Sequence, residues 1–293
     1  MHVLVTGAGG FSGAHMVMAL LQRGHRVSAC VGSSRGRLPE TAEQLGEVEI
    51  IAGDLAGTLD LPGGLDAIVH AAARSPAAGV TVDNLVRDNV SATARLVNHA
   101  NRQDIGVFLY FSSLSVYGRI AVPIVNETTP MVDLDAYGLT KRLGEEMLIG
   151  QAERMRSLSI RLPGVIGRGS VRNWLTNVLS AAREGREIAI FNPEAPFNNA
   201  AHVDDLARFV CDLLEDDWSG ADAVTIGAAG QMKVGEVVRL ISEAFGDRSR
   251  VRIEPGREPS FLVSSDRARE RYSYQPMAIA DMLSRFVAEN SAL

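Results

Sequence analysis

The segment "VLVTGAGGFSGAHMVMALLQRGH", residues 3–25, joins a short apolar strand to a helix through a glycine-rich turn. Gly7, Gly10 and Gly13 lack a Cβ, so the backbone can bend sharply there and approach a bound group closely. The helix that follows presents free N–H groups and the positive end of its dipole to that group. A strand before the glycines and a helix after them are typical of a dinucleotide-binding turn. We expect the pyrophosphate of the cofactor to be held by Gly7, Gly10, Phe11, Ser12 and Gly13.

Segments typical of strands and of helices alternate after this turn. The strand-like segments are "RVSACV", "VEIIAGD", "AIVHAAA", "VFLYFSS" and "SLSIRL", and they are apolar without strict alternation. Continuous apolar strands are typical of sheets covered on both faces, and repeated strand–helix units imply parallel strands. The sequence therefore predicts a Rossmann-type α/β fold with a doubly wound parallel sheet.

The regular alternation ends near Gly167, and helices, short strands and proline-containing loops follow. We expect residues 1–167 to form the dinucleotide-binding domain, with segments of about 188–228 returning to it. Residues 168–187 and 229–293 are then expected to form a smaller C-terminal substrate-binding lobe. A chain of 293 residues is long enough to bury a sizeable core.

The composition is that of a globular enzyme and argues against several other classes of protein. A net charge of −6 argues against a general nucleic-acid binder, which needs a concentrated basic surface. No stretch has the ~20 consecutive apolar residues of a membrane span. Cys30 and Cys211 lie far apart in apolar runs, which favours buried thiols in a reducing compartment over a disulfide or a metal site. We therefore expect a cytoplasmic protein without a metal centre.

The end of the second predicted strand bears on the choice between NAD and NADP. NAD-preferring sites usually place a carboxylate there for the ribose 2′-hydroxyl, but this strand ends in Val31 and Gly32. Arg35 and Arg37 follow, and a guanidinium pairs well with a 2′-phosphate. We expect an NAD(P) cofactor with NADP favoured. The alternative is that both arginines are solvated loop charges.

The third predicted strand leads to Asp54 and Leu55 in "AGDL". A carboxylate at this position can contact the adenine of the cofactor, and we assign both residues to the cofactor site. A loop carboxylate that caps the next segment explains Asp54 equally well.

The segment "DAYGLTKRLGEE", residues 135–146, sets Tyr137 and Lys141 one turn apart on one side of a predicted helix. Ser113 ends the strand-like "VFLYFSS", where functional groups gather in an open parallel sheet. A phenol with a pKa of about 10 needs about 4 kcal/mol of anion stabilisation to exchange a proton near pH 7. A cation at about 4 Å supplies an amount of that order at an effective dielectric of about 20. We expect Ser113, Tyr137 and Lys141 to move a proton, with Lys141 lowering the pKa of the phenol.

Eight motifs follow one another along the chain: "TGAGGFSG", "GDL", "VHAAA", "DNVSATARLV", "FSSLSVYG", "YGLTK", "RLPGVIG" and "HVDDLA". Together they resemble the extended short-chain dehydrogenase/reductase superfamily, in particular its nucleotide-sugar epimerase/dehydratase branch, over nearly the whole chain. The resemblance implies that Tyr137 is the catalytic acid/base, that Lys141 binds the nicotinamide ribose, and that Ser113 is the hydroxyl partner. It also implies cofactor contacts by Ala71, Ala72, Ala73, Asn89 and Pro163.

Two departures from the family pattern bear on the substrate. Dehydratases of this branch carry an acidic pair after the catalytic hydroxyl residue, and Leu114 and Ser115 in its place disfavour 4,6-dehydration. An arginine that often binds the substrate diphosphate is replaced by Asn198. Asn173 and Arg257 resemble diphosphate contacts of the substrate lobe, although surface polar residues have the same appearance. The expected substrate-binding residues are Ser113, Asn173, Asn198 and Arg257.

The histidine of "HVDDLA", His202, has a structural explanation. It precedes a predicted helix, where its ring can satisfy backbone groups. Asp204 and Asp205 then lie in the first turn, where negative charge favours the helix dipole.

The expected activity is hydride transfer between a nicotinamide and a carbinol carbon of a sugar, C4 of a nucleoside-diphosphate hexose. A 4-epimerase and a 4-ketoreductase share these catalytic residues, so both remain open. One alternative is an NADPH-dependent reductase of a non-sugar ketone, which Asn198 favours. Another is a non-catalytic dinucleotide-sensing protein, which typically lacks the tyrosine and the lysine. The resemblance also implies a homodimer through helices near residues 84–102 and 136–154, with no nucleic-acid or membrane partner.

Overall fold

The computed structural model describes residues 1–57, 59–256 and 259–291, which divide into two compact units. Unit 1 comprises Met1–Arg119, Met131–Arg161 and Ala207–Val224. Unit 2 comprises Ile120–Pro130, Leu162–Leu206 and Thr225–Leu293. Arg257, a predicted substrate contact, lies outside the described residues.

The division of the chain differs from the expected one. We expected segments of about 188–228 to return to the dinucleotide-binding domain, but the segment that returns is Ala207–Val224. Residues 188–206, which precede it, belong to unit 2 because their strands pair with other strands of that unit. The pairs are β9 (Ile188–Phe191) with β14 (Val251–Glu254) and β11 (Ala200–His202) with β8 (Gly164–Ile166).

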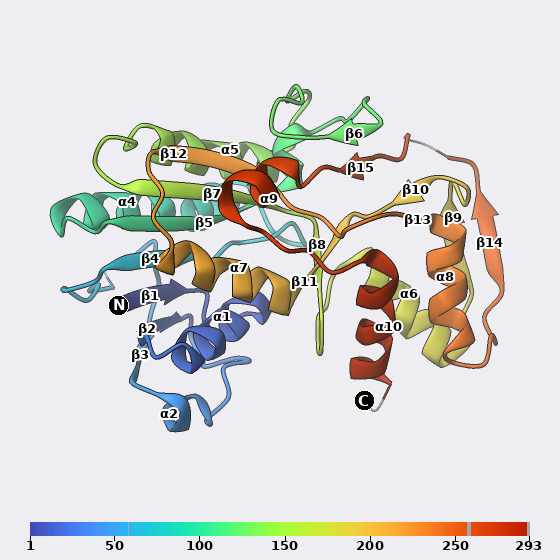
Figure 1. Cartoon of the computed structure of the whole chain (residues 1–293), viewed down its shortest axis with the longest axis horizontal. Coiled ribbons are helices and arrows are strands. Elements are labelled where there is room, and N and C mark those ends of the chain that lie inside the picture. The colour runs from blue at the N-terminus through green and yellow to red at the C-terminus, as the bar shows by residue number, and fades with distance from the viewer. Residues whose placement is uncertain (58, 257–258, 292–293) are drawn as a thin grey trace. The chain divides into compact units, whose positions relative to one another are not determined.

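Unit 1 is built on a seven-stranded sheet in the order β12-β7-β5-β4-β1-β2-β3 (Figure 1). β1 pairs in parallel with β2 and β4, β2 with β3, and β4 with β5. The strand order reverses between β1 and β4, and ligands of such sheets bind outside the carboxyl ends at this point. The predicted Rossmann-type fold is confirmed. The strands are β1 (His2–Thr6), β2 (Arg26–Val31), β3 (Val48–Ala52), β4 (Ala67–His70), β5 (Val107–Ser113), β7 (Arg156–Leu162) and β12 (Ala221–Thr225).

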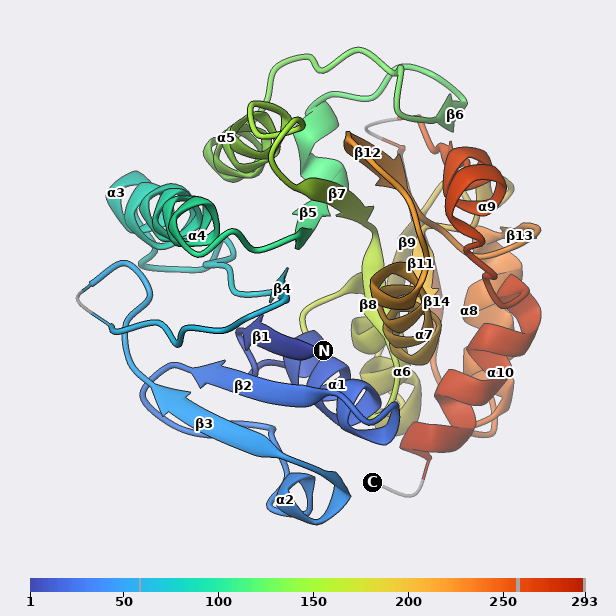
Figure 2. The same cartoon turned by 60° about the vertical axis from the view of Figure 1, so that its left-hand side comes forward.

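Helices cover both faces of this sheet (Figure 2). One face carries α1 (Phe11–Gln22) and the later turns of α7 (Val203–Glu215), which Arg23 joins through ion pairs with Asp212 and Glu215. The other face carries α3 (Val82–Leu85), the π-helical turn η1 (Val86–Ser91), α4 (Ala92–Arg102) and α5 (Ala136–Ile149). β4 and most of β5 are buried, as their continuous apolar sequence predicts. Unit 1 also contains α2 (Ala42–Leu45) and the 3₁₀ turn η2 (Leu114–Tyr117).

Unit 2 has a core of its own, which includes Leu179, Val238 and Phe286. These side chains come from α6 (Trp174–Glu184), α8 (Val234–Glu243) and α10 (Ile279–Asn290). The unit also holds α9 (Asp266–Tyr272) and two further strand pairs, β6 (Ile124–Val125) with β15 (Leu262–Val263) and β10 (Pro196–Phe197) with β13 (Met232–Lys233). Across the described parts of both units, no helix is long and apolar enough to cross a membrane.

Candidate active site

The glycine turn joins β1 to α1 where the strand order reverses. Gly7 has a φ of +68°, and a Cβ on it would lie 2.7 Å from Ala72 N. A Cβ on Gly13 would lie 2.1 Å from Gly7 O, so the helix packs directly on the turn. No side chain caps α1, and no acidic residue lies in its first turn. Its first N–H groups therefore form a site for an anion, which supports the predicted pyrophosphate contacts.

The loop after β2 lies against the glycine turn. Arg37 N donates a hydrogen bond to Gly9 O at 2.9 Å. The Arg35 guanidinium pairs with Glu43 at 2.9 Å, and its Nη2 donates to Pro39 O at 3.3 Å. Glu43 therefore competes for the guanidinium with any 2′-phosphate bound here.

Asp54 has the capping role that the sequence left open. Its Oδ1 accepts a hydrogen bond from Ala56 N at 3.0 Å, while its Oδ2 pairs with Arg87 of η1. Leu55 O accepts a hydrogen bond from Arg95 Nη1 at 3.1 Å. Both predicted cofactor residues are thus fixed by arginines from the helical layer, which sequence reasoning did not anticipate.

The chain after β4 passes beside the glycine turn and brings residues 71–73 to the reversal point. Ala72 N donates to Thr6 Oγ1 at 3.2 Å. His70 is fully buried, and its two ring nitrogens lie 2.7 Å from Thr6 Oγ1 and 2.9 Å from Thr93 Oγ1. Burial lowers the pKa of His70 to about 3, with a further contribution from Lys141, so the ring is neutral.

Asn89 lies within η1 and is buried. Its Oδ1 accepts from Arg74 N at 2.7 Å, and its Nδ2 donates to Arg74 O and to Thr140 Oγ1, each at 3.0 Å. The amide therefore ties the chain after β4 to α5. This geometry supports a positioning role more than the direct cofactor contact that we expected.

The start of α5 places Tyr137 beside Ser113. Asp135 caps the helix by accepting a hydrogen bond from Gly138 N at 2.7 Å. A Cβ on Gly138 would lie 2.2 Å from Ser115 O, so only glycine lets the helix approach η2 this closely. The Tyr137 hydroxyl lies close enough to the hydroxyls of Ser75 and Ser113 for both to act on its pKa, while Ser113 Oγ donates to Ser115 Oγ at 3.1 Å. The structure thus brings together the two hydroxyl residues that the sequence paired.

The pKa of Tyr137 differs from the expectation. Burial raises it above its ordinary value, the nearby hydroxyls of Ser75 and Ser113 act to lower it, and Asp135 raises it. In the structure the Lys141 amine donates a hydrogen bond to Phe111 O, and the expected lowering of this pKa by Lys141 stays a prediction. At neutral pH the Tyr137 hydroxyl is therefore a proton donor.

Lys141 is 2 % exposed and is one of only two lysines in the chain. Its Nζ donates to Phe111 O at 2.8 Å and lies 4.7 Å from the centroid of the Tyr110 ring. Burial lowers the pKa of Lys141 to about 7, although Glu145 acts to raise it. A buried lysine changes its charge readily, whereas an arginine does not.

Sequence reasoning missed Ser75 and the buried ion pair of Glu145 and Arg161. Ser75 lies just after residues 71–73, at the carboxyl end of β4. Arg161 interrupts the apolar strand "SLSIRL", and Glu145 lies one turn beyond Lys141 on the same helix. An arginine within an apolar strand and a glutamate one turn after Lys141 are the sequence features that could have indicated this ion pair.

The two predicted substrate-binding residues of unit 2 that the structure describes form hydrogen bonds within the protein itself. Asn198 Oδ1 accepts from Val263 N, and its Nδ2 donates to Val263 O, both at 2.8 Å. Asn173 caps α6 by accepting from Thr176 N at 2.9 Å. Both amides therefore have structural partners within the protein, although the sequence left a structural alternative, that of a surface polar residue, open only for Asn173. Pro163 directly follows β7.

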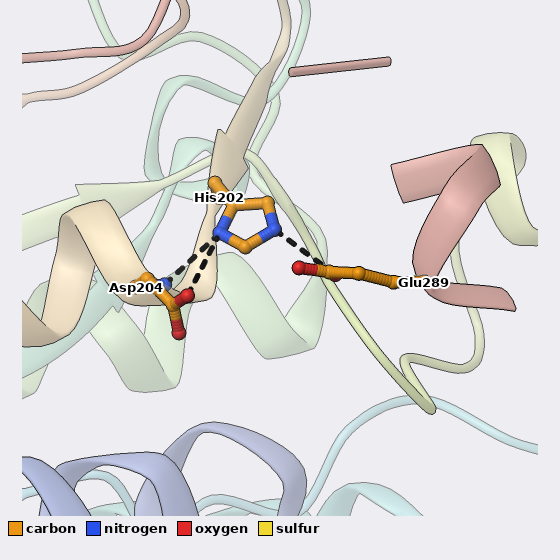
Figure 3. A group of neighbouring side chains, drawn as sticks. All are labelled: His202, Asp204 and Glu289. Carbon is orange, nitrogen blue, oxygen red and sulfur yellow. Dashed lines mark hydrogen bonds and ion pairs between the residues drawn. The ribbon is translucent and has the colours of Figure 1, made fainter. Parts of the chain in front are cut away.

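Among the described residues, one group brings three possible metal ligands within 4.8 Å of one another: His202, Asp204 and Glu289 (Figure 3). His202 Nδ1 accepts from Asp204 N at 3.2 Å, so the predicted backbone contact at the start of α7 is confirmed. His202 Nε2 lies 3.3 Å from Glu289 Oε2. Arg285 pairs with Asp204 and Glu289. Hydrogen bonds and ion pairs of these side chains therefore connect the start of α7 to α10.

Comparisons with known proteins find chains of similar sequence and fold. The chain is 26% identical over 302 residues to a dTDP-4-dehydro-6-deoxy-D-allose reductase of Streptomyces bikiniensis, covering 94% of this chain and 92% of that protein. It is 28% identical over 303 residues to a UDP-glucose 4-epimerase of Azospirillum brasilense, covering 94% and 87%. The crystal structure of a UDP-glucuronic acid 4-epimerase from Bacillus cereus in complex with NAD has a similar fold. Its TM-score is 0.85 at 21% identity, covering 99% of this chain and 98% of that one.

A family model gives the assignment. The model of the NAD dependent epimerase/dehydratase family matches residues 3–227. The match spans the glycine turn, Ser113, Tyr137 and Lys141, the residues whose geometry is described above. The chain therefore belongs to the NAD dependent epimerase/dehydratase family.

Proposed function

We propose that this protein is an NAD(P)-dependent oxidoreductase that transfers hydride at C4 of a nucleoside-diphosphate sugar, as a 4-ketoreductase or a 4-epimerase. The observation that carries the proposal is the proximity of the Tyr137 and Ser113 hydroxyls, with the buried Lys141 amine one helical turn away. Relatives at 26% and 28% identity have names of both reaction types and act on nucleotide sugars, which supports this substrate class.

Different groups carry out hydride transfer, proton transfer and orientation of the substrate oxygen. A nicotinamide dinucleotide, when bound at the glycine turn and residues 71–73, supplies or accepts the hydride. Tyr137 Oη gives a proton to the C4 oxygen as a ketone is reduced and takes it back as the alcohol is oxidised. Ser113 Oγ orients that oxygen by a hydrogen bond. The raised pKa of Tyr137 keeps the proton on the phenol at neutral pH, which favours the reductive direction.

The experiment uses the purified full chain, a panel of UDP- and dTDP-linked 4-keto sugars, and UDP-glucose. Net oxidation of NADPH or NADH with a 4-keto sugar identifies a ketoreductase. Interconversion of UDP-glucose and UDP-galactose without net change in the dinucleotide, which stays bound after dialysis, identifies a 4-epimerase. Neither reaction with any member of the panel would contradict the proposal.

We infer a preference for NADP, because β2 ends without a carboxylate and Arg35 follows it. Arg35→Ala is expected to weaken NADPH binding by about tenfold, since a charge-assisted hydrogen bond contributes roughly 1.5–3 kcal/mol, and to leave NADH binding nearly unchanged. Nicotinamide fluorescence titration measures both affinities. Arg26→Ala, at the opposite end of β2, removes the same charge as a control. Equal weakening of both dinucleotides by Arg35→Ala would contradict the preference.

We also propose a homodimer through the α3–α5 layer, whose surface carries exposed apolar pairs at a spacing of four. Leu139 and Leu143 on α5 are 52 % and 48 % exposed, and Val82 and Val86 lie on α3 and η1. Leu143→Asp is expected to weaken the dimer by about 100-fold, since a buried charge without a partner opposes association. Light scattering after size-exclusion chromatography measures the mass. Ile253→Asp, on β14, is the control for a new surface charge, and a wild-type monomer would contradict the proposal.

Two free, buried cysteines, Cys30 and Cys211, support a reducing, cytoplasmic location as part of the same proposal. Burial raises the pKa of each thiol to about 11, so neither is a reactive thiolate at neutral pH.

A further inference from the structure

A buried ion pair lies one helical turn beyond Lys141. Glu145 is fully buried and Arg161 is 3 % exposed. Arg161 Nε donates to Glu145 Oε1 at 3.0 Å, and its Nη2 donates to Oε2 at 2.8 Å. Burial acts to lower the pKa of Arg161, but its contacts with Glu145 and Tyr117 more than offset burial and raise it. The Arg161 guanidinium is therefore charged at neutral pH, and it forms an ion pair with the Glu145 carboxyl group.

The Glu145 carboxylate connects the elements that carry the catalytic residues. Ser112 Oγ, on β5, donates to Glu145 Oε1 at 2.6 Å. Arg161 Nη1, on β7, donates to the Tyr117 hydroxyl at 2.8 Å, at the end of η2. Lys141 Nζ donates to Phe111 O. Helix α5 is thus fastened to β5 at residues 111 and 112, directly before Ser113.

Glu145 is also the negative charge that acts on Lys141. Its charge raises the pKa of Lys141, against the larger effect of burial. His70 on β4 is neutral, and burial raises the pKa of Tyr110 on β5, so that phenol is neutral as well. Several other charged and titratable groups on neighbouring elements are paired: Asp88 of η1 with Arg74 and Arg87, Arg142 with Glu145 and Glu146, and Tyr117 with Arg161.

We propose that Glu145 is a positioning residue of the catalytic site, which favours the protonated form of the Lys141 amine and fixes α5 to the end of β5. Arg161 makes this possible because it compensates the buried carboxylate. The two charged groups of the ion pair act on Lys141 in opposite ways: the Glu145 carboxylate stabilises its charged form, and the Arg161 guanidinium weakens that effect by neutralising Glu145. The task of Lys141 itself rests on the proposed function.

The lysine content of the chain allows a direct test. With Lys141 and Lys233 as its only lysines, the full chain labelled with ¹³C-lysine gives two Cε signals. Lys233 is exposed and paired with Glu194, so its signal is an internal reference, and Lys233→Arg assigns it. We expect the wild-type Lys141 signal to titrate near pH 7, where burial places its pKa.

Two variants are expected to move this midpoint in opposite directions. Glu145→Gln removes the stabilising charge, so the midpoint should fall by about one pH unit. Arg161→Gln leaves Glu145 uncompensated, so the midpoint should rise. A merely structural role predicts lost stability in both variants and no opposite shifts. Unchanged midpoints, or two shifts in the same direction, would overturn the proposal.

Removing one partner of a buried ion pair costs about 3–5 kcal/mol, so either single variant can fail to fold. The double variant Glu145→Leu with Arg161→Met removes both charges and keeps the volume similar. Its Lys141 midpoint should lie below the wild-type value, because the charge that acts directly on Lys141 is that of Glu145. A folded double variant with the wild-type midpoint would overturn the proposal. Since the titration needs no substrate, absence of turnover would count against the proposed function and not against Glu145.

Discussion

Tyr137→Phe is expected to lower kcat for reduction of a 4-keto nucleotide sugar by about three orders of magnitude, within the range that a positioned general acid contributes. The hydroxyl is the proton donor that lies beside Ser113, and its raised pKa keeps it protonated at neutral pH. Phenylalanine keeps the ring and removes only this donor. Steady-state oxidation of the reduced nicotinamide measures kcat, and fluorescence titration measures dinucleotide binding, which should persist.

Tyr272→Phe is a matched control for this prediction. Tyr272 ends α9 and contacts Arg271 through its ring, and the same hydroxyl is removed. The control should keep wild-type kcat. If Tyr137→Phe turns over as fast as the wild type, the assignment of Tyr137 as the acid/base is wrong, whatever the substrate.

Gly13→Ala is expected to abolish tight dinucleotide binding and to lower the free energy of unfolding by about 2 kcal/mol, a typical cost of overpacking. The new Cβ would lie 2.1 Å from Gly7 O and 2.6 Å from Gly7 C, both backbone atoms. Either α1 moves away from β1 or the turn changes shape, and both changes displace the N–H groups at the helix start. Urea denaturation and dinucleotide titration measure the two effects.

Gly150→Ala is the control for the glycine substitution. Gly150 has a φ of −63°, and a Cβ there meets its nearest atoms, Glu146 O and Met147 O, at 3.6 Å, which is ordinary contact. This variant should be as stable as the wild type or more stable by about 0.5 kcal/mol, because alanine restricts the unfolded chain. Wild-type dinucleotide affinity in Gly13→Ala would show that the turn does not contact the cofactor.

Much of the fold followed from local sequence, and parts of the site did not. The glycine spacing and the continuous apolar strands predicted the parallel sheet, because the apolar residues of a strand indicate by themselves that the strand is buried. The pairing of Tyr137 with Ser113 was also predicted, since both lie where parallel strands and the following helix place them. The partners of Asn198 and Asn173 and the ion pair of Asp54 with Arg87 were not predicted, because a polar side chain pairs with the atoms that tertiary packing brings near it.

The sequence by itself determined the βα order, the dinucleotide-binding turn and the helical face shared by Tyr137 and Lys141, because each depends on residues close together in the chain. Only the tertiary structure decided the pKa values and the ion pair of the site. Burial raises the pKa of Tyr137 and lowers that of Lys141, and the fold brings Glu145 to Arg161, 16 residues away in sequence. A pKa depends on desolvation and on charges that neighbouring strands and helices bring within a few ångströms, and neither quantity is encoded in the spacing of two residues.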